Sequence, residues 1–433
     1  MTCGHHRNRD DDETGSTRRS LLRRAVAVGG ASALAACTDL ELDGRPTETR
    51  SVPRGPEDPS TLPERQHAWG AYLARDRFGN TTLPRHQLLL LLQYAGDGPT
   101  AAERETVEGA FRTLERAFQR GTGGDRRAVA HEGLLFVVGY APRWFDRFDA
   151  DLPASLDLPP PDVVIEELDE DAEPDEYDAV VHLASDVASV LLSAERALTG
   201  AVDRVNGIPV EGDLTSSFSV AGRRTGFVGE GQPARNYDVE AIPENAPLSM
   251  GFKSGLTDNL ATEDAVTIQS GPFAGGTTMQ VSRLTHDLDA WYDRSEAERV
   301  GLMFSPHHDP DDVGDIGENL TDDSGVTEAH VEALGAAAEE HGMVGHGQKV
   351  AAARDDDFEP TILRRDFDAN RGPGLHFDSW QRGIGEFVDV RREMNAKDID
   401  IDDAHNGILE FIDVKTRGTY LMPPRSLRAL PGP

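Results

Sequence analysis

Apolar runs alternate with amphipathic stretches along the body of the chain, and they predict strands followed by helices. Residues 133–140 form a continuous apolar run of strand length, and residues 141–143 (Ala-Pro-Arg) end it before a helical stretch opens at Trp144. A second unit of the same kind has a strand at 179–184 and a helix from about 186 to 198. A helix is also expected at 101–118, where apolar residues recur on one side.

The later part of the chain repeats this order of elements. A strand is predicted at 276–283, with Leu288 and Trp291 on the helical stretch after it. Another strand at 375–379 precedes a helix from about 381 to 395. Two halves with the same order predict an α+β fold made of a duplicated unit, with antiparallel sheets covered by helices and a division near residue 215.

Charge narrows the choice of partners. The formal net charge is -34, from 77 acidic and 43 basic residues. The lysines are scarce: Lys253, Lys349, Lys397 and Lys415. Such a surface stays hydrated and soluble at high salt, which screens its self-repulsion, so the composition indicates a halophilic protein. Nucleic acid is excluded as a partner, because no basic stripe is present outside the N-terminus.

The N-terminus carries a targeting pattern. Residues 17–37, TRRSLLRRAVAVGGASALAAC, begin with a twin arginine, continue through a short apolar run and end in Leu-Ala-Ala-Cys. The run is too short to span a bilayer, but it suits a cleavable signal. The pattern resembles a twin-arginine export signal with a lipoprotein cleavage box, which would place a lipid on Cys37. Cys3 is the only other cysteine, so no disulfide framework is expected in the exported chain.

These features predict the organisation of the whole chain. Residues 1–37 are the signal, and residues 38–62, which are polar and contain prolines, are a flexible tether. Residues 63–215 and 216–433 are the two modules. The expected location is the extracellular face of the cell membrane, with the N-terminal lipid as the membrane anchor.

Five segments carry a family resemblance: residues 133–149, 178–186, 274–300, 345–367 and 374–396. They resemble, in the same order, successive blocks of the dye-decolourising-type (DyP-type) haem peroxidases. The resemblance implies two ferredoxin-like modules of the dimeric α+β barrel type, with a pocket for haem b in the C-terminal half. This architecture agrees with the duplication that the hydrophobic pattern predicts.

The resemblance also implies roles for three residues. His346 matches the proximal ligand of the haem iron, and Arg364 matches the distal arginine. A neutral imidazole is a good axial ligand, and a guanidinium on the opposite face can stabilise negative charge on a bound peroxide. Arg365 is the alternative distal group, since a shift of one residue would exchange the two arginines.

The chain departs from the family at the distal acid. The family has an aspartate in a Gly-x-x-Asp-Gly motif, where its carboxylate can move a peroxide proton. Residues 251–255 read Gly-Phe-Lys-Ser-Gly, so Ser254 stands in place of the acid. Asp258 and Glu230 are nearby carboxylates that could compensate for it.

Three functional hypotheses follow. The first is an exported, membrane-anchored haem peroxidase that uses hydrogen peroxide and an unknown electron donor. The second is a surface lipoprotein that handles haem or iron without efficient peroxidase activity. The third is a cofactor-free interaction lipoprotein. A homo-oligomer is compatible with each of them.

Overall fold

A computed structural model describes residues 52–121, 131–397 and 399–433 of the chain. The predicted export signal, Cys37 and the tether as far as residue 51 lie outside the described residues. Residues 52–62, also expected in the tether, pack on the body: the backbone N–H of Gly55 donates to the carbonyl of Arg116 at 3.2 Å. They belong to the unit Val52–Pro433. No helix in the described ranges has the length and apolar composition needed to cross a membrane.

The first module has the strand and helix order of a ferredoxin-like unit. Its elements are β3 (His86–Tyr94), α2 (Ala101–Ala117), β4 (Leu135–Tyr140), β6 (Ala179–Ser185), α5 (Ala188–Leu198) and β9 (Phe218–Phe227). The strands lie in the order β9-β3-β6-β4, and all neighbours are antiparallel. The division between the modules therefore lies after Phe227 and not near residue 215. The glycine- and arginine-containing run at 222–226 (Gly-Arg-Arg-Thr-Gly) hides β9 in the sequence, and its pairing with β3 reveals it.

The second module repeats this topology. Its elements are β10 (Thr277–His286), β11 (Leu363–Arg364), β12 (Phe367–Ala369), β13 (Gly374–Gln381), α13 (Ile384–Asn395) and β14 (Ile412–Met422). The strands lie in the order β14-β10-β13-β12, with β11 also paired to β13. The long connection from β10 to β11 holds short helices: α7 (Leu288–Tyr292), α8 (Glu296–Met303), α9 (Pro310–Val313), α10 (Glu328–Glu332), α11 (Leu334–His341) and α12 (His346–Ala352).

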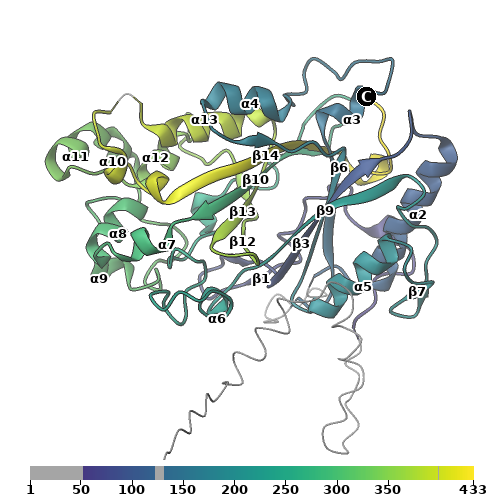
Figure 1. The fold of residues 1–433 in the computed structure, drawn as a ribbon, viewed down its shortest axis with the longest axis horizontal. Coiled ribbons are helices and arrows are strands. Elements are labelled where there is room, and N and C mark those ends of the chain that lie inside the picture. The colour runs from purple at the N-terminus through teal and green to yellow at the C-terminus, as the bar shows by residue number, and fades with distance from the viewer. Residues whose placement is uncertain (1–51, 122–130, 398) are drawn as a thin grey trace, which may run out of the picture. The chain divides into compact units, whose positions relative to one another are not determined.

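The two sheets join edge to edge into a closed barrel (Figure 1). At one seam β12 pairs with β9, where Asp368 lies opposite Phe227. At the other seam β14 pairs with β4, where Leu421 lies opposite Tyr140. Both seams are short: β12 and β9 pair over two residue pairs, and β14 and β4 pair over one. The predicted fold class, duplicated ferredoxin-like modules of the dimeric α+β barrel type, is confirmed.

Smaller elements complete the chain. These are β1 (Ala74–Arg75), β2 (Thr81–Thr82), α3 (Pro142–Phe145), α4 (Pro161–Leu168), β5 (Glu173–Pro174), β7 (Arg204–Val205), β8 (Ile208–Pro209), α6 (Gln232–Asn236), and the 3-10 helices η2 (Pro59–Thr61), η3 (Thr257–Asn259), η4 (Asp403–His405), η5 (Leu409–Phe411) and η6 (Arg425–Leu427). Among them β5 extends the sheet by pairing with β14 in parallel.

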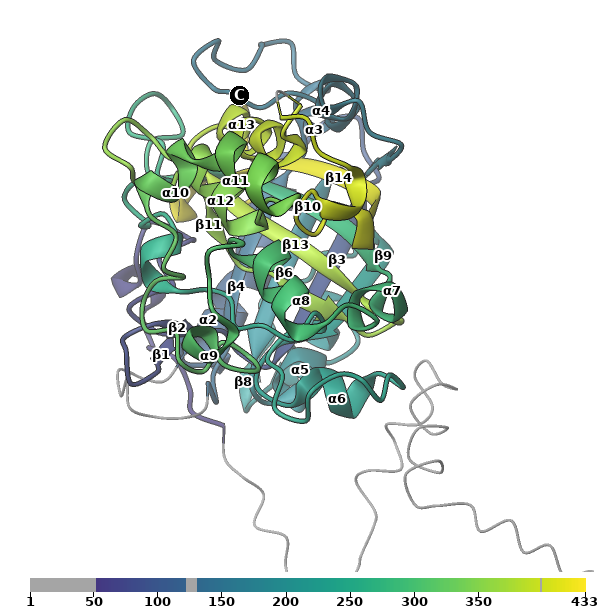
Figure 2. The ribbon, with the colours of Figure 1, turned by 90° about the vertical axis from the view of Figure 1, so that its left-hand side faces the viewer.

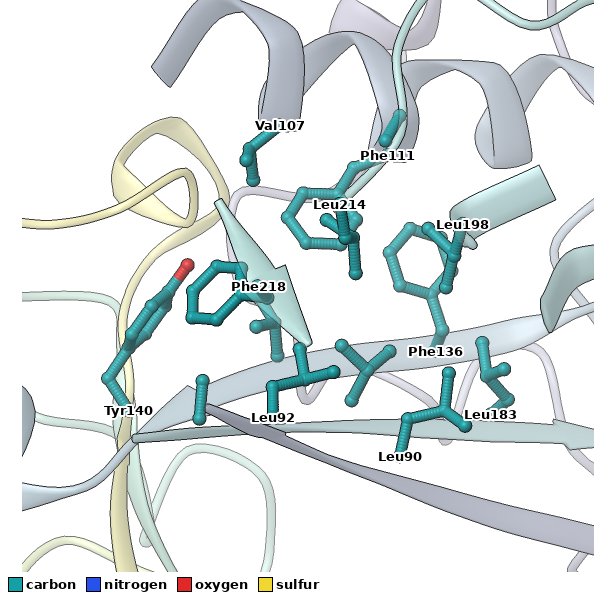
Figure 3. Close-up of a cluster of buried hydrophobic side chains, with 14 of the residues drawn as sticks. Leu90, Leu92, Val107, Phe111, Phe136, Tyr140, Leu183, Leu198, Leu214 and Phe218 are labelled. Carbon is teal, nitrogen blue, oxygen red and sulfur yellow. The ribbon is translucent and has the colours of Figure 1, made fainter. Parts of the chain in front are cut away.

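Helices of the first module cover its sheet with a layer of buried apolar side chains (Figure 3). Successive strand residues point to opposite faces, so Leu90 and Leu92 of β3 face α2 and α5, while Leu89 and Leu91 face the barrel interior. A capping box starts α2: the hydroxyl of Thr100 accepts the N–H of Glu103, whose carboxylate accepts the N–H of Thr100. The strands and helices predicted at 101–118, 133–140, 179–198, 276–283 and 375–395 are confirmed within a few residues.

Candidate functional site

The helices of the second module do not close on their sheet, and a cavity remains between the two layers. The space between them amounts to about 1160 Å³, open solvent at its mouth included. Figure 2 faces this side of the molecule, with α8, α11 and α12 in front of β10 and β13. Much of the wall is apolar, from residues that include Met303, Val350, Leu375, Phe377, Phe387 and Val390.

His346 is the first residue of α12 and lines this cavity. Desolvation, aided by the nearby charges of Lys349, Arg364 and Arg391, lowers the pKa of its imidazole to about 3. The ring is therefore neutral at ordinary pH and keeps a lone pair for a metal. Its Nδ1 atom is buried without a hydrogen-bond partner.

The start of α12 is held from several sides. A Cβ at Gly345 would lie 2.0 Å from the carbonyl oxygen of Phe304, so only glycine fits directly before His346. Gln348 accepts the N–H of Gly345 and donates to the carbonyl of His330, both at 2.9 Å. The Lys349 ammonium donates to the carbonyls of Met394 and Asn406, which binds α12 to neighbouring segments. These contacts fix the position of the histidine before any ligand binds.

The structure separates the two candidate arginines. Arg364 ends β11 and lines the cavity together with His346. Arg365 does not line this cavity: it is 3 % exposed, and its guanidinium lies 5.2 Å from the ring centroid of Trp380. Neighbouring residues of an extended chain point to opposite sides, so only one of the pair can reach this wall. Of the two, Arg364 is the one that faces the cavity.

The other predicted residues are only partly brought together. Ser254 lies on the cavity wall. Asp258 does not: it belongs to η3, its side chain is exposed, and its backbone N–H donates to the carbonyl of Asp322. The expectation that Asp258 supplies an acid to the site is therefore corrected. Glu230 lies on the wall of an adjoining hollow, which we name the vestibule.

The vestibule meets the cavity along a short shared wall. The residues common to both are Leu248, Lys253, Ser254, Arg364 and Asp366. The vestibule then extends to the β1–β2 turn, where Asp76 accepts from the Lys253 ammonium at 2.6 Å. A small molecule that passes from the vestibule into the cavity would cross this shared wall.

Asp366 is a cavity residue that the sequence analysis missed. It follows Arg364 by two positions, and positions two apart in an extended chain share a face. That spacing is the signal that could have found it. Burial raises the pKa of its carboxyl to about 6, against the lowering effect of the Arg364 charge.

Comparison with solved structures identifies the fold. The chain aligns with a dye-decolorizing protein from V. cholerae at a TM-score of 0.52 and 15 % identity, covering 83 % of this chain and 98 % of the other. A DypB variant from Rhodococcus jostii RHA1, in complex with heme, gives 0.53 and 18 %, covering 81 % and 96 %. A DypB variant in complex with manganese gives 0.51 and 18 %, covering 81 % and 97 %. At these identities the likeness shows the fold, which is that of the DyP-type peroxidases.

A model of a protein family matches residues 84–424, and the chain belongs to that family, a family of unknown function (DUF7405). No curated protein matches the chain.

Proposed function

We propose that this protein is a haem-binding, peroxidase-like oxidoreductase that uses hydrogen peroxide. One observation carries the proposal: in a DyP-type fold, a neutral histidine and an arginine, His346 and Arg364, line the same deep cavity. These are the two residue types that a haem peroxidase needs on its cofactor, one to bind iron and one to stabilise a charged oxygen.

The residues present fit a haem. The apolar wall suits a flat porphyrin, and the neutral imidazole of His346 suits iron. His286 also lines the cavity, its Nε2 atom is buried without a partner, and burial lowers the pKa of its ring to about 4. A neutral ring in the tautomer that carries its proton on Nε2 can donate a hydrogen bond to a haem carboxylate.

Each residue then has a physical task. A bound haem would supply the redox chemistry, by giving electrons to peroxide and recovering them from the electron donor. His346 would hold the iron, and Arg364 would orient peroxide and offset negative charge on its oxygens. The vestibule would deliver peroxide to the Arg364 side of the cavity. Apolar walls would exclude bulk water, which strengthens each of these electrostatic interactions.

The proposal extends to location and partners. The twin-arginine pattern and Cys37 support export and a lipid anchor at the outer face of the cell membrane. An electron donor of unknown identity would complete the reaction. Replacing Cys37 with serine should release the protein from membranes into the medium, and continued membrane association of that variant would contradict the lipid anchor.

The direct test is an ultraviolet–visible spectrum of the full chain, folded in high salt with haemin. Wild type should show a Soret band distinct from that of free haemin, and His346→Ala should lose it. His341→Ala is the matched control, because His341 is exposed and lies outside the cavity wall. If wild type and His346→Ala both give the spectrum of free haemin, the proposed cofactor is wrong.

A second function is favoured by Ser254. A neutral hydroxyl at the position of the family's acid would suit a surface protein that holds haem or iron with slow turnover. In that case the haem-loaded protein would consume hydrogen peroxide slowly, and Ser254→Asp should raise the rate of consumption. The remaining hypothesis, a cofactor-free interaction lipoprotein, predicts no haem uptake in the same experiment.

A further inference from the structure

We infer that Asp366 is the proton acceptor for hydrogen peroxide in this cavity. It would take the role of the aspartate that DyP-type peroxidases have where this chain has Ser254. The inference rests on the proposed function. It assigns the acid-base role to a residue on the strand side of the cavity, close to Arg364, and not to the 251–255 loop.

Acidic residues are abundant in the chain but almost absent from this wall. There are 77 aspartates and glutamates in the sequence. Among the described residues that line the cavity, Asp366 is the only one with a carboxylate. It also lies on the wall shared with the vestibule, as do Ser254 and Arg364. A base at this junction would meet peroxide where it enters.

The Asp366 carboxylate is held in place by one hydrogen bond, and its second oxygen can still accept another. Its Oδ1 accepts the backbone N–H of Asp378 at 3.0 Å, which anchors the group to β13. Its Oδ2 lies 3.8 Å from a guanidinium nitrogen of Arg364 and has no hydrogen bond to a described residue. The side chain is 8 % exposed, so it is sheltered from bulk solvent but not sealed. A carboxylate has room for several donors, so Oδ2 can accept a peroxide O–H.

The charges around Asp366 tune its basicity. Arg364 and Arg365 favour the carboxylate, while the neighbouring Asp378 opposes it, as does burial. Asp366 in turn disfavours ionisation of Asp368 in β12. The net result is a pKa raised to about 6. The group is therefore ionised at neutral pH, yet it is a stronger base than an ordinary aspartate, as a general base near its working pH should be.

The step assigned to Asp366 is a proton transfer. Hydrogen peroxide gives one proton to Oδ2, so a carboxylate and HOOH become a carboxylic acid and HOO⁻. Arg364, beside Oδ2, offsets the charge of the anion. No oxidant or reductant is needed for this step.

The experiment uses the full chain loaded with haemin and two readouts. Asp366→Asn should slow the reaction with hydrogen peroxide by about 10²–10⁴-fold, the usual contribution of a general base. It should also slow cyanide association by at least tenfold, because hydrogen cyanide must lose a proton to bind as the anion, and this readout does not depend on turnover. Asp389→Asn, on the exposed face of α13, is the matched control and should leave both rates unchanged.

Further controls separate loss of the carboxylate from damage to the pocket. Asparagine retains an oxygen for the Asp378 N–H, and an unchanged Soret band would show that the pocket is intact. Asp366→Glu should recover part of both rates if the carboxylate matters. Ser254→Asp in the Asp366→Asn background should recover peroxide reactivity, since it restores an acid on the same shared wall.

The outcomes separate the inference from the proposed function. If wild type takes up no haemin, the proposed function fails. If haemin binds through His346 but both rates are the same in wild type and Asp366→Asn, the inference about Asp366 is overturned and the proposed cofactor stands. If Asp366→Asn does not fold, the protonated-carboxyl infrared band of wild type, followed with pH, is compared with that of Asp366→Glu. A band unaffected by this substitution would also overturn the inference.

Discussion

The two modules share one sheet topology, but they differ in how their helices meet the sheet. In the first module α2 and α5 lie on a face rich in leucine, valine and phenylalanine, and these side chains are buried (Figure 3). In the second module the corresponding face carries polar side chains such as Gln280 and Ser282, which hydrogen-bond to each other at 2.9 Å. The first ferredoxin-like module thus packs its helices closely on its sheet, whereas the second leaves a cavity between its helices and its sheet.

The connection between the first two strands of each module explains the difference. In the first module a long capped helix, α2, lies along the sheet. In the second module the connection runs from residue 287 to 362 and folds into the short helices α7 to α12. Short helices can surround a space without filling it, which leaves room for the cavity and places His346 on its wall.

The largest effect on stability is expected from shortening a buried side chain of the first module. Phe111 is 1 % exposed and stacks on Phe136, so Phe111→Ala should lower the free energy of unfolding by about 3–5 kcal/mol. Phe377→Ala, on the cavity wall, should cost less than Phe111→Ala, because the Phe377 side chain already borders empty space. Denaturant titration in high salt measures both, and equal losses would contradict the comparison.

The buried carboxyl of Asp368, in the second module, should make the stability of the protein depend on pH. Burial raises the pKa of Asp368 from 3.8 to about 7. Between these two values the folded state binds more protons than the unfolded state, so stability should fall as the pH rises from about 4 to about 7, by up to about 4 kcal/mol. Asp368→Asn should flatten that slope in unfolding curves measured across this range. A slope unchanged by the substitution would show that Asp368 titrates normally.

Two leucine-to-tryptophan substitutions, one in each module, test whether the first module is packed more closely than the second. Leu90→Trp, under α2 and α5, should destabilise the protein by about 1–3 kcal/mol or more, since a close-packed core resists added volume. Leu284→Trp, on the cavity wall, should change stability by less than about 1 kcal/mol but reduce haemin uptake. Thermal unfolding and haemin titration are the two measurements. Comparable destabilisation at both positions would mean that the cavity is not free space.

The smallest effect is expected at the vestibule. Lys253 and Asp76 form an ion pair at 2.6 Å, and their side chains are 24 % and 28 % exposed. Lys253→Met should change stability by less than about 1 kcal/mol, because a solvent-accessible pair gains little and salt screens it. A loss above that value in high salt would assign the pair a structural role.

The sequence predicted the fold better than the site. Apolar runs such as 133–140 and 179–184 are buried on both faces, so their composition alone marks them as strands. By contrast, β9 has no regular apolar pattern and contains Gly-Arg-Arg-Thr-Gly at 222–226, so its place in the first module appears only through pairing with β3. Asp258 and Asp366 show the same limit at the site, because local spacing could not tell which carboxylate reaches the cavity.

By itself the sequence determined the local elements, the duplication and the acidic composition, which depend on residue type and short-range spacing. The pairing of His346 with Arg364 or Arg365 was implied by the resemblance to a family. Only the tertiary structure decided that the sheets close into a barrel, that Arg364 and not Arg365 faces the cavity, and that Asp366 lies there. Those outcomes depend on strand register and on which face each element buries. Contacts between residues far apart in the chain set both.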